Sequence, residues 1–482
     1  MKKYPHYIPA LSVGLLAFLL YAFTGARTIQ WQDSAQFTYR IVSGTLWNEY
    51  GLAMVHPLHF WLGRLSLWIF PGPDPWAVSL VSAFGGALAV GLVYLCVHKI
   101  TNQSKAALFA AITLLFAHTF WRFSGLPEVY TLSAALLLAE GLAYLHLYKT
   151  HRPQAWWMLF FFNGLGFANH NLALLSSAVW GLLFLRWCAE SSGRWKHLIA
   201  IAGAWVMGAL PYLALIVVEM NQTRSVGPVV HSALFGEGFH GQVTGLVPQL
   251  RYTFISVGFL LLSFPSLALV FVGIALTRLR SAKLKMCLPF VAIGLLHLLF
   301  FLRYNVIDQY TFLIPVFALL ALMAGVGYAH QQYPIFRRIA WILIVIQPIL
   351  YSTIPTLVRG SGVLKSFARQ KPYRDDYGYL FYPWQVQERS ADRLVREAFG
   401  TLGESGSLVI EDSMFLYTAG WMREELELNE SVDLIRPGTF ADKTHLLPVV
   451  WVPARADKEP SEGWRKEGEV WVVPQALLPE GT

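Results

Sequence analysis

Apolar stretches close to 20 residues long recur through residues 1–352 and constrain the fold more than any other feature of the chain. A helix of about 20 apolar residues matches the thickness of a bilayer core. The 482 residues are 55% hydrophobic and 14% charged, whereas a soluble domain has about 25% charged residues. The pattern therefore predicts an all-α polytopic membrane protein.

We expect about eleven transmembrane helices in this region. The N-terminal apolar run is long for a signal peptide, so we interpret it as the first membrane helix. The predicted helices cover residues 7–24, 76–98, 105–120, 127–148, 155–168, 170–188, 196–218, 251–277, 286–302, 309–330 and 337–354.

The distribution of charge predicts the orientation. With the N-terminus in the cytoplasm, the inner loops contain 15 Lys and Arg and a single acid, Glu190, whereas the outer loops contain seven basic and seven acidic residues. Cytoplasmic loops of membrane proteins are enriched in Lys and Arg. An odd number of helices then places the C-terminal region outside the cytoplasm. The net charge of +8 is therefore a topology signal for a chain in a lipid bilayer, and we expect no nucleic-acid partner.

The first outer loop, residues 25–75, is long. Its second half contains an apolar run of about 15 residues, which is too short to span a bilayer comfortably. Trp47, Trp61 and Trp68 in this loop favour a helix that lies in the outer interface.

Residues 355–482 differ in character from the membrane region, residues 1–354. Four short β-branched or aromatic runs predict strands, and two longer segments predict helices, so we expect a small extracytoplasmic α/β domain. The predicted strands are 408–412, 432–436, 449–453 and 469–474, and the predicted helices are 384–400 and 413–427.

A mixed set of acids, histidines, arginines and amides lies at the outer ends of the predicted helices. Intramembrane and helix-end ionisable residues of this kind usually mark a functional site. A partly buried carboxylate can act as a general base, arginines bind phosphate through forked donors, and histidines position groups or shuttle protons. This mixture suits group transfer from a lipid-phosphate donor to a hydroxyl acceptor. The set comprises Asp33, Gln36, Glu49, His56, His59, Arg64, Arg122, Glu128, Asn169, His170, Asn171, Glu219, His231, Glu237, His240, Arg251, Arg303, Asn305 and Asp308.

Several motifs follow the order found in one branch of the GT-C membrane glycosyltransferases. This branch contains bacterial multi-spanning proteins and the metazoan plexin-domain protein O-mannosyltransferase, and the resemblance covers about residues 28–330. The post-membrane stretch RDDYGYLFYPWQ (374–385) is also similar to the family. The motifs are WQDSAQF (31–37), VHPLHFWLGRL (55–65), FWRFSGLPEVYTL (120–132), GLGFANHNL (164–172) and RYNVIDQYTFLIP (303–315).

The resemblance implies a polyprenyl-phosphate sugar donor, an inverting displacement and a catalytic Asp in the first outer loop, which Asp33 matches. It favours mannose as the sugar, protein Ser/Thr or a glycan as the acceptor, and a bacterial inner membrane as the location. Gln36 replaces an acid of the family pattern, so we expect no cofactor, with a divalent metal left open. The three cysteines, Cys96, Cys188 and Cys287, fall at predicted cytoplasmic helix ends and predict no disulfide or Cys-based metal site.

We therefore expect Asp33 to be the base and three arginines to bind the donor phosphate: Arg303 first, then Arg64 and Arg122. The residues expected to shape the sugar and acceptor sites are Gln36, His56, His59, Glu128, Tyr130, Asn169, His170 and Asp308.

Other interpretations stay open. Each candidate also has an ordinary structural role: a helix cap for Asp33, a first-turn acid for Glu128, or a headgroup contact for Arg64 and Arg122. Glu140 lies within a predicted helix and suits an interhelical hydrogen bond. Two other functions remain, a transporter of lipid-linked sugars and a non-enzymatic assembly protein, although a transporter needs polar residues at mid-membrane.

Overall fold

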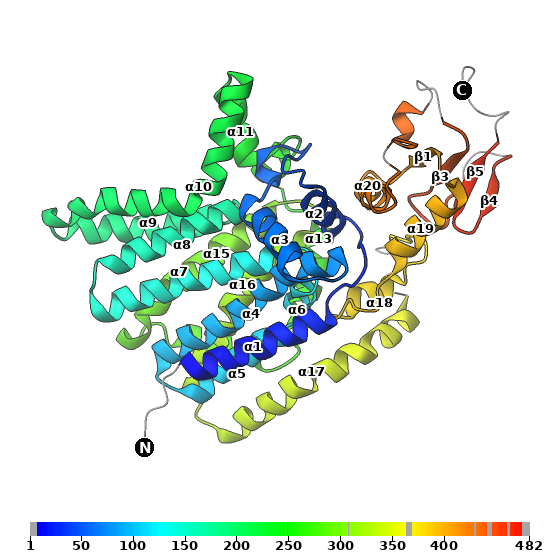
Figure 1. Ribbon diagram of the computed structural model, residues 1–482. Coiled ribbons are helices and arrows are strands. Elements are labelled where there is room, and N and C mark those ends of the chain that lie inside the picture. The colour runs from blue at the N-terminus through cyan, green and yellow to red at the C-terminus, as the bar shows by residue number, and fades with distance from the viewer. Residues whose placement is uncertain are drawn as a thin grey trace.

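The computed structural model consists of a helical bundle and a small C-terminal α/β domain (Figure 1). It describes residues 7–245, 247–306, 308–362, 369–428, 430–440, 446–459 and 463–474. The helices of the bundle are α1 (Tyr7–Thr24), α2 (Asp33–Ser43), α3 (Pro57–Ile69), α4 (Asp74–Thr101), α5 (Ser104–Leu115), α6 (His118–Ser124), α7 (Tyr130–Thr150), α8 (Gln154–Asn169), α9 (Ala173–Ala189), α10 (Leu198–Thr223), α11 (Gly227–Phe235), α12 (His240–Thr244), α13 (Leu250–Ser263), α14 (Ala268–Thr277), α15 (Leu288–Arg303), α16 (Ile314–His330) and α17 (Pro334–Ser361).

Every predicted membrane helix falls on an apolar helix or a bent helix pair. In the described part of the chain, seven helices are long and apolar enough to cross a membrane, and nine if each bent pair counts as one span. The bent pairs are α5–α6, with an angle of 67°, and α13–α14, with an angle of 97°. The remaining two predictions, 155–168 and 170–188, correspond to the shorter helices α8 and α9. The fold class is therefore confirmed.

Small residues allow the bundle helices to approach closely. A Cβ atom added to Gly164 of α8 would lie 2.2 Å from the carbonyl oxygen of Trp205, and one added to Gly208 of α10 would lie 2.2 Å from that of Phe161. The two helices therefore pack backbone against backbone, which is a common way for membrane helices to associate. Gly164 also belongs to the motif GLGFANHNL, which suggests that part of that motif serves packing.

The first outer loop folds into α2 and the 13-residue helix α3. At 1.5 Å per residue α3 is only about 20 Å long, too short to span, and Trp61 and Trp68 on it are exposed. Arg40 of α2 is buried and donates hydrogen bonds to the carbonyl oxygens of Leu46, Met54 and Val55. One guanidinium thus organises the loop between the two helices.

The C-terminal domain contains a five-stranded sheet in the order β2-β1-β3-β5-β4. β1 is parallel to β2 and β3, and β5 is antiparallel to β3 and β4. Four strands match the predicted ones. The edge strand β4 was not predicted because its residues, Arg-Lys-Glu, are charged and carry no apolar alternation. The elements of the domain are α18 (Asp376–Phe381), α19 (Ser390–Leu402), β1 (Gly406–Ile410), α20 (Phe415–Glu425), β2 (Val432–Ile435), β3 (Val449–Val452), β4 (Arg465–Glu467) and β5 (Val470–Val473).

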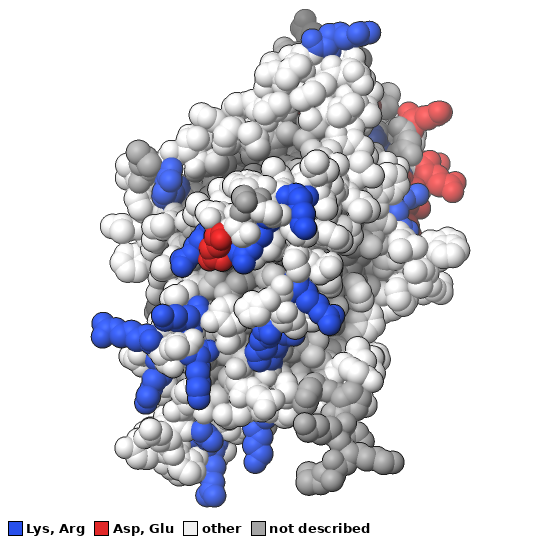
Figure 2. Space-filling view, turned by 90° about the vertical axis from the view of Figure 1, so that its left-hand side faces the viewer, with Lys and Arg blue, Asp and Glu red and all other residues white. Residues whose placement is uncertain are grey.

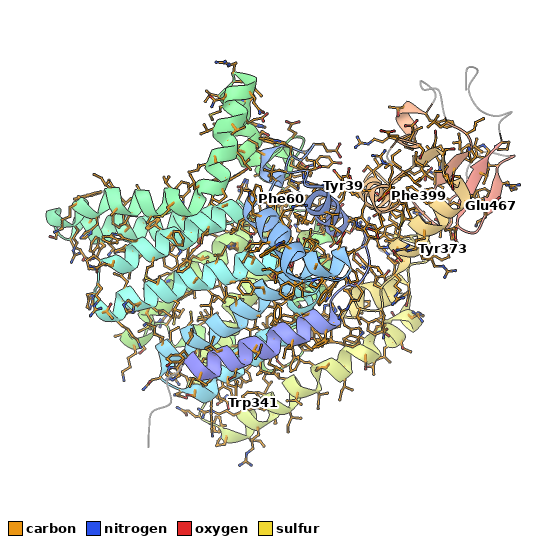
Figure 3. All side chains as sticks on the ribbon, viewed as in Figure 1. Tyr39, Phe60, Trp341, Tyr373, Phe399 and Glu467 are labelled. Atoms are coloured by element: carbon orange, nitrogen blue, oxygen red, sulfur yellow. The ribbon has the colours of Figure 1, made fainter. Side chains whose placement is uncertain are left out.

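The C-terminal domain packs directly against the first outer loop. Trp31 shares a hydrophobic core with α19, α20 and the sheet, and its indole Nε1 donates to Ser390 Oγ at 2.8 Å. Glu49 forms an ion pair with Arg436 at 2.8 Å. Tyr39 of α2 points toward the domain, with its ring 6.2 Å from that of Tyr417 (Figure 3). The tail therefore lies at the same end of the bundle as residues 25–75.

The opposite end of the bundle carries most of the exposed basic side chains. Figure 2 shows this face, with many Lys and Arg and few acidic groups. The one acid predicted for the inner loops, Glu190, pairs with Arg194 at 2.7 Å. The helix connections on this face are the ones that the charge pattern places on the inner side.

Candidate active site

A cavity of about 340 Å³ lies where the outer loops of the bundle meet the C-terminal domain. Small-molecule sites usually have volumes of about 300–1,000 Å³. Five segments that are distant in sequence form its walls: residues 31–34, residues 122–128, helix α13, residues 308–311 and residues 369–381. The cavity therefore exists only in the folded chain.

Asp33 is the first residue of α2 and lines the cavity. The preceding residue, Gln32, has φ 60° and ψ −136°, a backbone conformation that costs energy in a non-glycine residue and is often found at functional sites. Burial, followed by the nearby charge of Asp308, raises the pKa of Asp33 to about 7, and Arg369 opposes this shift. A carboxyl with a pKa near neutrality is suited to general base catalysis.

Glu128 and Asp308 also line the cavity, so with Asp33 three carboxyl groups of the bundle face one space, and Asp376 adds a fourth from the C-terminal side. Burial and the charges of Asp33 and Asp308 raise the pKa of Glu128 well above its usual value. Burial likewise raises the pKa of Asp308, and Arg369 lowers it. Among the residues that the structure describes, no group of three or more His, Cys, Asp and Glu is arranged to hold a metal ion.

The motif residue Ser34 holds Glu128 in place. Its hydroxyl donates to Glu128 Oε1 at 3.2 Å. The backbone of Glu128 is fixed by Ser82 of α4, whose hydroxyl accepts from the Glu128 amide at 2.9 Å and donates to its carbonyl at 2.8 Å. The acid is thus positioned by two helices rather than by its own loop.

Arg122 lies on α6 and is the most deeply buried of the cavity arginines that the bundle supplies. It is 2% exposed, and neither Nε nor Nη1 has a hydrogen-bond partner among the described residues. Its guanidinium lies over the ring of Tyr379, 4.4 Å from the ring centroid. A buried guanidinium with free donors at a cavity wall is suited to binding an anion.

Residues 369–381 supply the wall that comes from the C-terminal side. Arg374 forms a buried ion pair with Asp376 at 2.5 Å, and its guanidinium also lies 4.4 Å from the centroid of the Tyr379 ring. Arg369 lines the cavity as well. Tyr379 therefore stands between two arginines that belong to different parts of the fold.

The loops that follow β1 and β3 form a clamp on residues 370 and 371 of this wall segment. Lys371 forms an ion pair with Asp412 at 2.5 Å, and these side chains are 9% and 19% exposed. Gln370 accepts a backbone hydrogen bond from Ala456 at 2.8 Å and a side-chain one from Arg455 at 2.7 Å. Two residues of the clamp thus lie between Arg369 and Arg374, and the C-terminal domain positions part of the cavity.

Helix α13 forms an apolar wall. Phe254, Phe259 and Leu262 face the cavity, and the neighbouring side chain of Leu261 is 56% exposed on the outside of the bundle. Arg251, at the start of the same helix, also lines the cavity. The cavity therefore has a charged end at the outer loops and an apolar side next to an exposed apolar surface of the bundle.

Of the twelve predicted site residues, the structure brings Asp33, Arg122, Glu128 and Asp308 together around the cavity. Arg303 and Arg64 do not line it. The Arg303 guanidinium donates to the carbonyl oxygens of Gly245 and Thr244. Arg64 donates to those of Ile41 and Val42 at 2.9 Å each. Their donors are used to hold backbone segments, so the expectation that they bind phosphate does not match their positions.

Four of the six remaining predicted residues form a largely buried cluster behind the cavity: His56, Tyr130, Asn169 and His170. The imidazole Nδ1 of His56 is 2.9 Å from the carbonyl oxygen of Asn169, and its ring stacks on His170 with centroids 5.0 Å apart. The ring of Tyr130 lies 5.6 Å from that of His170. Burial lowers the pKa of His56 to about 4, so the ring is neutral at physiological pH. These residues support the loop of Glu128 and do not line the cavity.

Gln36 and His59 are also buried away from the cavity. Gln36 Nε2 and both ring nitrogens of His59 have no hydrogen-bond partner among the described residues. The ring of His59 packs edge-on against Phe37, with centroids 5.0 Å apart.

The cavity residues that were absent from the predicted site include four polar ones of the C-terminal wall: Arg369, Arg374, Asp376 and Tyr379. Three of them lie in RDDYGYLFYPWQ, a stretch whose family resemblance was noted. The concentration of charged and aromatic residues directly after the last membrane helix was the signal that could have identified them.

Both the sequence and the fold of this chain resemble known proteins. Residues 55–220 match the family model described as dolichyl-phosphate-mannose-protein mannosyltransferase. The structure is similar to ArnT from Cupriavidus metallidurans bound to undecaprenyl phosphate, with a TM-score of 0.60 and 15% identity over 92% of this chain and 93% of that chain. The apo form of that protein gives a TM-score of 0.56 at 14% identity, with 92% of each chain covered.

A weaker match is the oligosaccharyltransferase AglB from Archaeoglobus fulgidus, with a TM-score of 0.49 and 13% identity over 92% of this chain and 69% of that chain. No curated protein matches the sequence significantly. The similarity to ArnT over nearly the full length of both chains shows that this chain has the GT-C fold. The fold that the order of the motifs implied is thereby confirmed.

Proposed function

We propose that the protein is a membrane glycosyltransferase that transfers a sugar from a polyprenyl-phosphate donor to an acceptor hydroxyl. The observation that carries this proposal is the composition of the cavity. It combines three carboxyl groups of the bundle, a buried arginine with unused donors and an apolar wall next to an exposed apolar surface of the bundle. A lipid-phosphate sugar has the matching parts: a polar sugar, an anion and a hydrocarbon chain.

In this mechanism Asp33 acts as the general base. It takes the proton of the acceptor hydroxyl as the hydroxyl oxygen forms a bond to the anomeric carbon of the sugar. The bond between that carbon and the phosphate oxygen breaks, and polyprenyl phosphate leaves with the electron pair. The single displacement inverts the anomeric configuration. Arg122 stabilises the charge that develops on the phosphate.

The other cavity residues orient the substrates. Arg369 and Arg374 approach the phosphate from the C-terminal side, and Glu128 and Asp308 accept hydrogen bonds from sugar hydroxyls. The apolar wall of α13 receives the first isoprene units of the donor. Because Leu261 on the same helix is exposed to the lipid side, the rest of the hydrocarbon chain can stay in the bilayer.

Mannose is the preferred sugar and a protein Ser/Thr hydroxyl the preferred acceptor in this proposal. The support is the description of the family model that matches residues 55–220. The structure of ArnT contains undecaprenyl phosphate, which supports a polyprenyl-phosphate donor. The charge asymmetry of the loops supports a cytoplasmic N-terminus and an extracytoplasmic site in a bacterial inner membrane.

The test is transfer from a radiolabelled polyprenyl-phosphate mannose to Ser/Thr peptides by the purified protein in lipid nanodiscs. We expect transfer by the wild type, none by Asp33→Asn, and full activity of Glu237→Gln, which removes an exposed acid that does not line the cavity. Transport of the labelled lipid across proteoliposomes without any transfer would instead support a flippase. A panel of labelled donors decides the sugar, and retention of all labels on the lipid would refute the proposal.

A further inference from the structure

A second, much smaller cavity of about 20 Å³ lies within the membrane bundle, away from the proposed active site. Helices α7, α8, α9, α15 and α16 converge on it. Glu140 of α7 and His297 of α15 both line it, and their side chains are 1% and 3% exposed. Two ionisable side chains thus face one buried space between helices, where such groups are costly and usually have a specific partner.

Glu140 and His297 differ in their hydrogen bonding. Glu140 Oε1 accepts from Asn163 Nδ2 at 3.1 Å, and Oε2 accepts from Trp180 Nε1 at 2.6 Å. His297 has no hydrogen bond at either ring nitrogen among the described residues. A neutral imidazole carries one N–H donor and one acceptor nitrogen, so His297 brings an unused donor and an unused acceptor to the site.

The volume and the lining chemistry point to a small polar ligand. A buried water needs about 10–15 Å³ of accessible space and two to four polar partners, and this cavity satisfies both conditions. The remaining polar groups in the wall are the hydroxyl oxygens of Ser133 and Ser176. Each already donates to a backbone carbonyl, so each offers only a lone pair toward the cavity.

We propose that this cavity is a binding site for one water molecule, which bridges the carboxyl group of Glu140 and the imidazole of His297. Water can donate to an oxygen of Glu140 and can also accept from the N–H of His297. A metal cation would find only two of its usual ligand types in this wall, Glu140 and His297, and no group of three or more His, Cys, Asp and Glu that could hold a metal occurs in the described part of the chain. The proposal therefore commits to water.

A glycine maintains the space for this molecule. A Cβ atom added to Gly166 would lie 3.7 Å from Glu140 Oε1 and 3.0 Å from the Cβ atom of Ala173, and Gly166 itself lines the cavity. An alanine at this position would narrow the space beside the carboxyl group and compete with the water.

The site is connected to the loop that carries Glu128. Ser133 Oγ donates to the carbonyl oxygen of Val129 at 3.2 Å and accepts from Asn169 Nδ2 at 2.8 Å. Asn169 Nδ2 also donates to the same Val129 carbonyl at 2.9 Å. The bound water thus completes a buried polar network that extends from the middle of α7 to the residue after Glu128.

The decisive experiment is a structure of the full chain in nanodiscs at a resolution that shows ordered waters. We expect one peak within hydrogen-bonding distance of both Glu140 and His297, and its loss in His297→Phe, which keeps a ring but removes both nitrogens. An empty cavity would overturn the proposal. A peak at this position that becomes stronger after exchange into thallium or rubidium salts would also overturn it, in favour of a cation.

Thermal unfolding provides an independent test that does not require a high-resolution map. Gly166→Ala should lower the midpoint of unfolding, whereas Gly181→Ala, a helical glycine with open space around its Cβ position, should leave it unchanged or raise it. His297→Gln, which restores a donor and an acceptor, should be more stable than His297→Phe. Equal midpoints within both pairs of variants would contradict a water-filled polar site. Neither test depends on the proposed enzymatic function.

Discussion

Replacement of Arg122 by Met should weaken donor binding while making the unliganded protein more stable. The guanidinium is 2% exposed, and its Nε and Nη1 have no hydrogen-bond partner among the described residues. Leaving a buried polar group unpaired costs about 1–3 kcal/mol. Methionine removes this cost and keeps a side chain of similar length, although it also loses the cation–π contact with Tyr379, which is worth about 0.5–2 kcal/mol.

The affinity of Arg122→Met for the donor should fall, although its stability rises. Truncating one partner of a buried, hydrogen-bonded charge pair costs about 2–5 kcal/mol. Because about 1.4 kcal/mol corresponds to a factor of ten in Kd, we expect Arg122→Met to weaken binding by roughly 30-fold or more. The donor affinity of Arg122→Lys should lie between those of the wild type and Arg122→Met, since lysine keeps the charge but lacks the forked donors of arginine.

The assay is binding of undecaprenyl phosphate in detergent or nanodiscs, combined with the midpoint of thermal unfolding. Arg303→Met is the matched control, because its guanidinium holds the carbonyl oxygens of Gly245 and Thr244 and does not line the cavity. We expect it to lose stability and to change Kd much less than Arg122→Met. Unchanged affinity in Arg122→Met, or a larger loss in Arg303→Met, would refute the assignment of the phosphate site.

Four further results are expected. Asp33→Asn should reduce the rate of transfer by about 10²–10⁴-fold, the usual contribution of a general base, with little change in the Kd of the donor, and Asp33→Glu should keep only a trace of transfer activity. Transfer by Asp33→Asn above a tenth of the wild-type rate would exclude Asp33 as the base. The value of kcat/KM should rise with pH and level off above about 7, because the base form of Asp33 is needed and its pKa is raised to about 7. As pH rises from the unfolded pKa to the folded one, the free energy of unfolding should fall, because a carboxyl with a raised pKa binds its proton more tightly in the folded state and loses that stabilisation. A flat activity profile would contradict this assignment. Lys371→Met should leave Asp412 buried and unpaired and should raise the KM for the donor more than it lowers kcat. The additional change Asp412→Leu should partly restore KM. An unaffected KM would show that the clamp does not position the cavity wall. Turnover should persist after treatment with a chelator, and activity that is abolished by the chelator and restored by one divalent ion would show that the enzyme depends on a metal.

The sequence by itself determined those features that depend on short-range pattern. Runs of about 20 apolar residues predict membrane helices because the bilayer imposes that length, and all eleven predictions fall on helices or bent pairs. Short runs of β-branched and aromatic residues identified four of the five strands. Asp33 could be selected because an acid in a motif-rich outer loop stands out among only nine acids in residues 1–352.

Only the tertiary structure decided which cations face the cavity. Arg122 and Arg303 both lie near the outer ends of apolar helices, and their local sequences do not distinguish them. Arg303 is occupied by carbonyl groups of residues 244 and 245, whereas Arg122 is enclosed by Tyr379, more than 250 residues later in the chain. The availability of a donor depends on what packs around it, and packing between distant segments leaves no local pattern in the sequence.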